Sequence, residues 1–138
     1  MNDETVRTKI EQGRAEFAFK CAEEGKEHGT KYKSQINKIP MMIKTNGLGA
    51  TLAFIYSKKD KKKEGPVFKL IGRQIKDWIN LHDKYKYYFG DEKLKDFEHL
   101  VEKVVEINSP QYRALTVEIL ALFNWLRRFA EGMIDGEA

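Results

Sequence analysis

Cysteine and long apolar runs are scarce in this chain, and each shortage excludes a class of protein. Cys21 is the one cysteine among 138 residues, so we exclude a disulfide framework and expect a reducing compartment. No apolar run approaches the roughly 20 residues that span a bilayer. The opening Met-Asn-Asp-Glu does not resemble a signal peptide. We therefore expect a cytoplasmic protein with no membrane partner.

Recognisable catalytic patterns are also missing. The three histidines are scattered without zinc-ligand spacing, and a single cysteine cannot form a thiolate metal site. Gly47 and Gly49 are followed by Leu52 where a dinucleotide fingerprint needs glycine, and no Gly-Lys-Ser/Thr follows. A pair of carboxylates that meets only in the fold stays open. We predict no enzyme activity, no catalytic residue, no metal and no cofactor.

Charge is abundant and unevenly distributed. The net charge is +4, yet residues 1–30 carry −2, residues 31–95 carry +10, and residues 96–138 carry −4. A basic centre attracts a polyanion by releasing its counterions, and oppositely charged ends attract each other in a head-to-tail assembly. A lysine-rich surface that only keeps the protein soluble explains the composition equally well.

Apolar residues recur with helical spacing throughout, which predicts an all-α bundle of about five to six helices in one domain over residues 1–138. The first helix is capped by Asn2 or Asp3, carries Val6, Ile10, Phe17 and a buried Cys21, and ends near Gly25 or Gly29. The second runs from about Tyr32 through Pro40 to Ile43 or Lys44. The third, Leu48 to Tyr56, is apolar nearly all round and is expected at the centre of the bundle.

Three further helices follow. The fourth begins after Gly65-Pro66 and buries Phe68, Ile71, Ile75, Trp78 and Ile79, and the fifth spans about Leu94 to Val104. Ser109 as N-cap with Pro110 at the first helical position starts the last helix. Its apolar stripe at alternating spacings of three and four comprises Tyr112, Leu115, Ile119, Leu122, Leu126, Phe129 and Met133.

Two connecting segments are rich in lysine or tyrosine. Residues 57–66 contain five lysines and no apolar side chain other than proline, which favours a mobile surface loop over a nonspecific nucleic-acid contact. Residues 85–89 hold three tyrosines and a phenylalanine beside lysines. Such aromatics can stack on bases, although they more often cover the end of a helical core.

The segment Lys38–Phe54 is the most informative one. A helix containing Pro40 ends in Asn46-Gly47-x-Gly49, and an apolar helix begins at once. Gly47 supplies the positive φ that closes a helix, and the backbone N–H groups of such a corner can face a phosphate. Two interpretations remain open at this point, a plain helix cap and an anion-binding turn.

Three stretches together resemble a known family. They are Arg14–Phe19, the Lys38–Phe54 segment, and Tyr112–Glu131. The family is the small α-helical subunit, the fifth, of the type III-B CRISPR effector called the Cmr complex. The central motif is specific, and the three matches cover about a third of the chain. Residues 57–111 match in general helical character alone.

The resemblance implies a non-catalytic role in antiviral defence. In that family, copies stack head to tail beside the backbone subunits and line the groove that holds CRISPR RNA paired to target RNA. It therefore implies three kinds of partner, namely these RNAs, other Cmr subunits and further copies of the chain. The implied RNA contacts are Lys38, Lys44, Asn46, Arg14, Arg127 and Arg128.

Each implied contact has a structural alternative. Lys38 and Lys44 can be solvated surface charges, Asn46 can be a turn residue, and the arginines can pair with glutamates. Two other functions stay open for the whole chain. It can be a free-standing helical nucleic-acid-binding protein, or an assembly module that does not touch RNA.

Overall fold

The computed structural model describes the backbone of residues 3–136 and the side chains of residues 9–136, and its regular structure is entirely helical. The predicted all-α bundle is confirmed. Its elements are α1 (Asp3–Gly25), η1 (Lys26–His28), α2 (Thr30–Asn46), α3 (Leu48–Lys58), α4 (Gly65–Asn80), η2 (Asp83–Phe89), α5 (Phe97–Val104) and α6 (Ser109–Met133), where η marks a 3₁₀-helix. The predicted cap Asn2 lies outside the described residues, as does the side chain of Val6.

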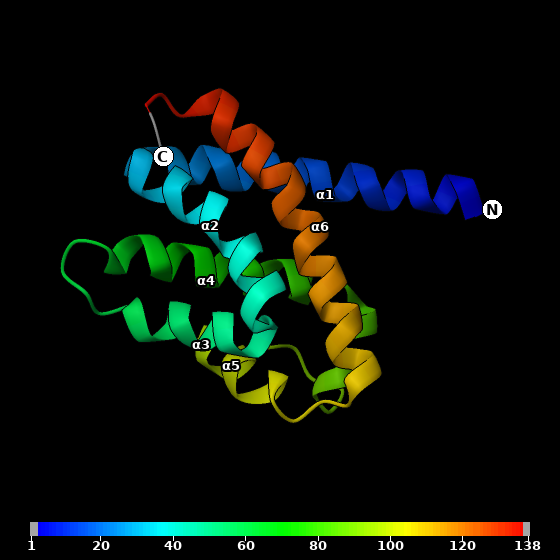
Figure 1. The fold of residues 1–138 in the computed structure, drawn as a ribbon. Helices are drawn as coiled ribbons and strands as arrows, with labels where there is room; N and C mark the ends of the chain where they lie inside the picture. The colour runs from blue at the N-terminus through cyan, green and yellow to red at the C-terminus, as the bar shows by residue number, and fades with distance from the viewer. Residues whose placement is uncertain (1–2, 137–138) are drawn as a thin grey trace.

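The helices form two groups that share one core. α1 and α6 pack across each other, and α2 packs beside α6 and leads into the antiparallel pair α3 and α4, with α5 beneath them (Figure 1). The amino-terminal part of α1 projects beyond the body of the molecule (Figure 1). Accordingly Ile10, predicted on the buried stripe, is exposed, whereas Cys21 further along α1 is buried as predicted.

The core is built from the predicted apolar faces. All five predicted residues of α4 are buried, and on α6 the four central residues Leu115, Ile119, Leu122 and Leu126 are buried. Tyr112, Phe129 and Met133 of the same stripe pack against the core at its edge. Burial of such side chains, at about 25 cal/mol per Å², is the main stabilising contribution to the fold.

Three sequence-based predictions need correction. The α3 helix is not buried all round, because Ala50 and Ala53 are exposed while Leu48, Leu52 and Ile55 face the core. The N-cap of α6 is Asn108, one residue earlier than predicted, because its side chain accepts the Gln111 N–H at 3.0 Å in a capping box. The lysine-rich connection is shorter than predicted, since the flanking helices extend to Lys58 and from Gly65.

The tyrosine segment folds as the 3₁₀-helix η2. Tyr85 and Phe89 are buried against the core, while Tyr87 is 74% exposed. The segment therefore covers one end of the core, as the structural interpretation predicts.

A buried lysine ties α2 to the end of α6. Lys33 is 4% exposed, and its Nζ donates to the carbonyls of Ile134 at 3.0 Å and Gly136 at 2.7 Å. Glu131 lies 3.5 Å from the same ammonium group. These contacts fix the carboxyl end of α6, where backbone carbonyls otherwise lack donors.

Candidate nucleic-acid interface

The corner between α2 and α3 is held by backbone geometry and one tyrosine. Gly47 has φ of +92°, a conformation that side chains disfavour, and its N–H donates to the Ile43 carbonyl at the end of α2. The Gly49 N–H donates to the Tyr112 hydroxyl at 2.7 Å. A Cβ on Gly49 would lie 3.4 Å from that hydroxyl. Gly47 is therefore required by its backbone conformation, whereas a Cβ on Gly49 would make ordinary contact. One of the α3 amino-terminal N–H groups already has a protein acceptor.

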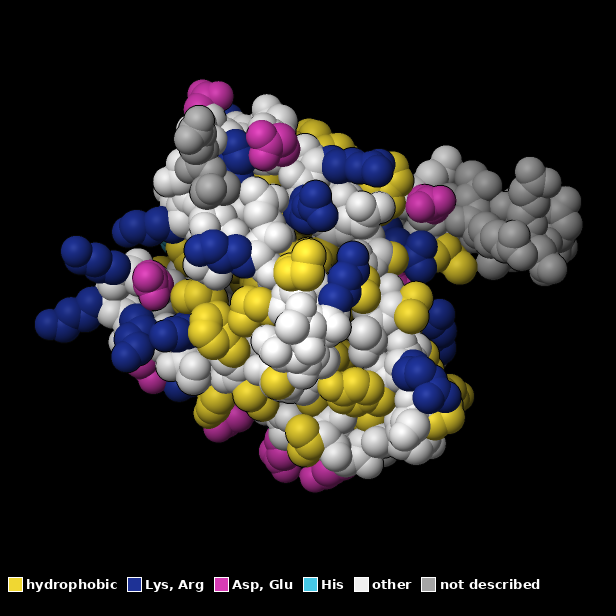
Figure 2. Space-filling view, viewed as in Figure 1, with side chains coloured by type: hydrophobic (Ala, Val, Ile, Leu, Met, Phe, Trp, Pro, Cys, Tyr) yellow, Lys and Arg dark blue, Asp and Glu magenta, His cyan; other side chains and the backbone are white. Residues whose placement is uncertain are grey.

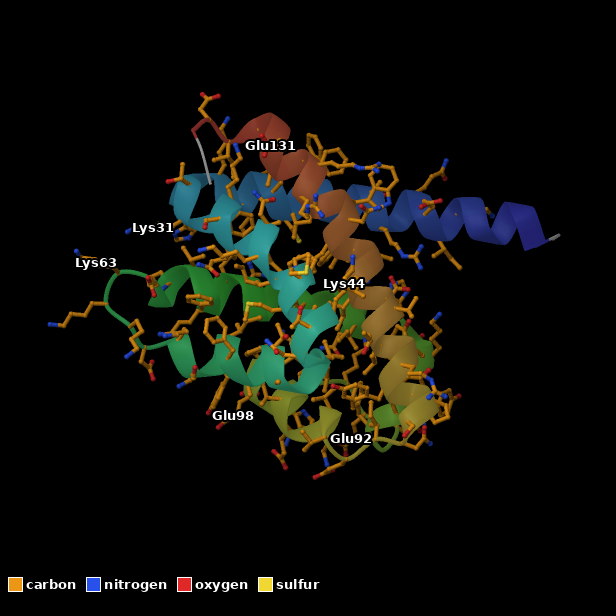
Figure 3. The ribbon with its side chains drawn as sticks, viewed as in Figure 1. Lys31, Lys44, Lys63, Glu92, Glu98 and Glu131 are labelled. Carbon is orange, nitrogen blue, oxygen red and sulfur yellow. The ribbon has the colours of Figure 1, made fainter. Side chains whose placement is uncertain are left out.

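The exposed side of this corner is basic. Lys44, Thr45 and Asn46 are all exposed on the last turn of α2. Figure 3 shows Lys44 near the middle of the face formed by α2, α3 and α6. No Asp or Glu occurs in α2 or α3, and α6 contains two, Glu118 and Glu131. Glu118 is buried, so within the described residues Glu131 at the edge is the one exposed carboxylate contributed by these three helices.

We call this surface the basic face, defined by its exposed cations from α2 and α6. Figure 2 shows lysine and arginine side chains across the viewed side of the molecule, with acidic side chains mainly at its margins. In Figure 3, Glu131 lies at the upper edge and Glu92 and Glu98 lie at the lower edge. The defining cations are Lys31, Lys38, Lys44, Arg113, Arg127 and Arg128.

A groove runs along the amino-terminal half of α2. It has a volume of about 330 Å³ and lies between α2 and the start of α4. Lys31 and Lys38, seven residues apart on one side of α2, line it together with Ser34, Gln35 and the acidic Glu64. Hydroxyl, amide and ammonium groups are donors for phosphate oxygens and sugar hydroxyls. The groove therefore offers polar donors beside the apolar side chains of Val67 and Phe68.

Five of the six predicted contacts are exposed on the basic face. Lys38, Lys44 and Asn46 lie on α2, and Arg127 and Arg128 lie on α6. The Arg128 guanidinium also lies 5.9 Å from the centre of the Trp125 ring. The two groups come from separate parts of the chain and lie on neighbouring helices because α2 packs beside α6.

Arg14 is placed differently. Its Nε and Nη2 donate to the two carboxylate oxygens of Glu118 at 2.7 and 3.0 Å. The structural alternative, an arginine paired with a glutamate, thus matches the geometry. Glu118 also accepts hydrogen bonds from Trp78 at 3.1 Å and Tyr85 at 3.4 Å.

The Arg14 pair determines the protonation of this cluster. Burial alone would raise the pKa of Glu118, but the hydrogen bonds and charge of Arg14 outweigh it and the pKa lies below its ordinary value. The hydrogen bond to Glu118 in turn raises the pKa of Arg14. The cluster is an ionised structural pair inside the bundle.

Cys21 lies outside this cluster. Burial raises its pKa to about 12, so its thiol stays protonated and unreactive.

Sequence reasoning missed Lys31, Arg113 and Tyr112 as parts of this region. Lys31 was detectable from its seven-residue spacing to Lys38, which places both on one helix face. Arg113 and Tyr112 reach the corner through the packing of α6, for which no local pattern gives a signal.

Among the residues described, no group of three or more His, Cys, Asp or Glu side chains is arranged to hold a metal ion. No described helix is both long and apolar enough to cross a membrane.

Comparison with known proteins places the chain in a family. A family model described as CRISPR-associated protein (Cas_Cmr5) matches residues 10–133. A Thermus thermophilus protein named CRISPR system Cmr subunit Cmr5 is 28% identical over 104 residues, which are 75% of each chain. The crystal structure of a CRISPR-associated Cmr5 family protein from Thermus thermophilus matches with a TM-score of 0.70 and 26% identity. That match covers 91% of this chain and 97% of that one.

The fold is that of a small all-α protein with exposed cations on α2 and α6. Because the family model spans most of its length, the chain belongs to the Cmr5 family of CRISPR-associated proteins. The family resemblance predicted from three sequence stretches is confirmed.

Proposed function

We propose that this chain is a cytoplasmic, non-catalytic subunit of a type III-B CRISPR Cmr complex and contacts RNA through its basic face in antiviral defence. Membership of the Cmr5 family supports the assignment to the complex, because the Thermus relative is named as a Cmr subunit. The observation that carries the RNA contact is the charge of α2, α3 and α6, where six exposed cations face solvent with one exposed carboxylate at the edge.

The proposed contacts are sequence-independent. Lysine and arginine neutralise phosphates and release counterions, while base pairing between CRISPR RNA and target RNA supplies specificity. We assign phosphate contacts to Lys38, Lys44, Arg127 and Arg128, with Asn46 as a further donor; Lys31 and Arg113 join them. Arg14 is set aside because its guanidinium binds the buried Glu118.

Contacts with other subunits are proposed at the lower part of the same face. Val105, near the α3–α6 corner, is 74% exposed, and Val117 on α6 is 64% exposed. A depression of about 530 Å³ there is lined by Ala50, Val105 and Tyr112 among others. Exposed aliphatic side chains around a concave surface favour a protein contact over solvent.

Self-association head to tail is proposed from the distribution of charge. The carboxylates Glu92 and Glu98 at the lower edge lie apart from Lys31 and Lys63 at the left side (Figure 3). Two copies stacked with these regions opposed would gain favourable electrostatic interaction.

Binding of labelled single-stranded RNA to the full chain, followed by fluorescence anisotropy, tests the proposal. We expect Lys38→Glu with Lys44→Glu to weaken binding at least about tenfold at moderate salt, since two phosphate contacts become repulsions. The matched control, Lys9→Glu with Lys93→Glu, makes the same change in net charge at exposed lysines outside the basic face. If the two double variants bind RNA with equal affinity, the basic face does not contact RNA. The alternative function, an assembly module that does not touch RNA, would then be favoured.

A further inference from the structure

A second cationic pocket lies outside the basic face, between α3, α4 and the start of α5. Its volume is about 400 Å³, within the range of small-molecule sites. One of its lining residues, Glu98, lies at the lower edge of the molecule in Figure 3, away from Lys44 on the basic face.

Aromatic side chains form its apolar wall. Phe68 is buried, and Phe97 and Tyr56 are partly exposed beside it. Phe97 packs so closely on Gly72 that a Cβ there would lie 2.8 Å from the ring, which holds the ring in place. The Tyr56 hydroxyl donates to Glu98 at 2.5 Å, and the Lys59 ammonium lies 4.5 Å from the centre of the Tyr56 ring. Phe97, and the face of Tyr56 that Lys59 does not cover, offer a planar ligand a surface on which to stack.

Cations form the rim of the pocket. Five of the lining residues are basic and two, Asp96 and Glu98, are acidic. Arg73 pairs with Glu24 and Asp77, Lys76 pairs with Asp77, and Lys59 pairs with Asp60. Among the side chains of residues 9–136, Lys69 and Lys95 take part in no ion pair within 4.0 Å. They therefore leave positive charge at the rim for an anion.

Both carboxylates on the wall already accept a hydrogen bond from within the protein. The Asp96 carboxylate accepts the His99 N–H at 2.8 Å as the cap of α5, and Glu98 accepts the Tyr56 hydroxyl. Each carboxylate keeps acceptor capacity, because an ionised carboxylate has about four lone-pair sites. The pocket therefore combines an aromatic wall, hydrogen-bond acceptors and an unneutralised cationic rim.

We propose that this pocket binds one nucleotide, with the base against Phe97 and Tyr56 and the phosphate between Lys69 and Lys95. Base stacking on aromatic side chains and charge-assisted binding of phosphate are the two interactions that this combination provides. The exocyclic amino group of a base matches the acceptors on the wall. The nucleotide is either free or the terminal residue of an RNA strand.

Isothermal titration calorimetry of the full chain with AMP tests the site, with adenosine and ribose 5-phosphate as partial ligands. We expect one saturable site for AMP and binding about tenfold or more weaker for each partial ligand, because each lacks one of the two interactions. Equal binding of AMP and ribose 5-phosphate would overturn the proposal, as would the absence of saturable AMP binding.

Two variants separate the pocket from general electrostatics. Phe97→Leu keeps an apolar side chain on Gly72 but removes the ring, and we expect AMP to bind about tenfold more weakly. Lys69→Glu with Lys95→Glu, at two exposed positions, is expected to abolish measurable AMP binding while the thermal unfolding midpoint is kept. Lys38→Glu with Lys44→Glu on the basic face is the control and is expected to leave AMP binding unchanged. Unchanged AMP affinity in the two pocket variants would overturn the proposal.

A five-nucleotide RNA carrying a 5′ phosphate distinguishes the two sources of the nucleotide. If its affinity falls in Phe97→Leu and exceeds that of AMP, an RNA end is the ligand; if AMP binds more tightly, the free nucleotide is. An RNA that is sensitive to the basic-face variant but not to the pocket variants, with no binding of AMP, contradicts the pocket and leaves the basic face supported.

Discussion

The Tyr112 hydroxyl accepts the backbone N–H of Gly49 at 2.7 Å, which joins the first turn of α6 to the first turn of α3. A helix amino terminus has N–H groups without partners inside the helix, so this hydroxyl acts as a cap supplied from another helix. The contact sets the position of the corner that carries Lys44 and Asn46.

Removal of this hydroxyl tests the role of the cap. Tyr112→Phe keeps the ring at the core edge and leaves the Gly49 N–H without its acceptor, so we expect a loss of about 1 kcal/mol in the free energy of unfolding. Urea denaturation measures it. Tyr87→Phe, at a residue that is 74% exposed, is the matched control and should change stability very little. A Tyr112→Phe protein as stable as the control would show that the bond contributes nothing.

Gly47 is required by its backbone conformation. At φ of +92° an alanine is strained, and we expect Gly47→Ala to reduce the free energy of unfolding by about 1–2 kcal/mol. Gly13 lies within α1, and a Cβ there meets no atom within 4 Å. Gly13→Ala should therefore be neutral or stabilising by up to about 1 kcal/mol. Equal thermal midpoints of the two alanine variants would show that the backbone conformation of Gly47 does not require glycine.

The Glu118 carboxylate is the centre of the buried polar cluster. Glu118→Gln removes the charge that pairs with Arg14 and weakens the hydrogen bonds that Trp78 and Tyr85 donate to this side chain. We therefore expect a loss of about 2 kcal/mol in the free energy of unfolding. A double-mutant cycle with Arg14→Met isolates the coupling between the two charges. Additive effects in the cycle would contradict a direct pair.

His82 makes stability dependent on pH. It lies edge-on to Trp78, with ring centres 4.4 Å apart, and burial lowers its pKa although the charge of Glu118 acts in the opposite direction. The unfolded chain then binds the proton more readily than the folded one, so this contribution to stability is complete above about pH 6.5 and is lost as the pH falls.

Measured unfolding free energies should decrease between pH 7.5 and 5.5 in the unmodified chain and decrease less in His82→Phe. His28→Gln serves as the control, since its side chain belongs to the η1 segment away from this cluster. Identical pH slopes for His82→Phe and the unmodified chain would exclude His82 as the titrating group. The lowered pKa of Glu118 adds a second loss at more acid pH, as its carboxylate becomes protonated.

Helical periodicity was sufficient to predict the six α-helices and most of their buried faces, because the spacing of apolar residues is a local property. The α4 face is an example, with Ile71, Ile75 and Trp78 buried as predicted. Exposure of Ala50 and Ile10 was not predictable, since it depends on which side of a helix other helices cover.

The candidate site likewise contains residues that the local sequence predicts and residues that only tertiary packing brings together. Lys38 and Lys44 were expected as RNA contacts because their segment, Lys38–Phe54, resembles a known family, which is local information. The ion pair of Arg14 and Glu118 joins residues that are 104 positions apart in the sequence. The hydrogen bond between the Gly49 N–H and the Tyr112 hydroxyl joins residues that are 63 positions apart. Such pairs arise from tertiary packing, and a single sequence carries no signal for them.

Binding of the RNA backbone by the basic face is tested by the salt dependence of the affinity. The dissociation constant for single-stranded RNA is measured across a range of salt concentrations for the unmodified chain and for Lys38→Ala with Lys44→Ala. We predict a steep linear loss of affinity on logarithmic axes, with a slope smaller by about 1.4 in the variant, since each phosphate contact contributes about 0.7. A slope that is the same in both proteins would contradict the account.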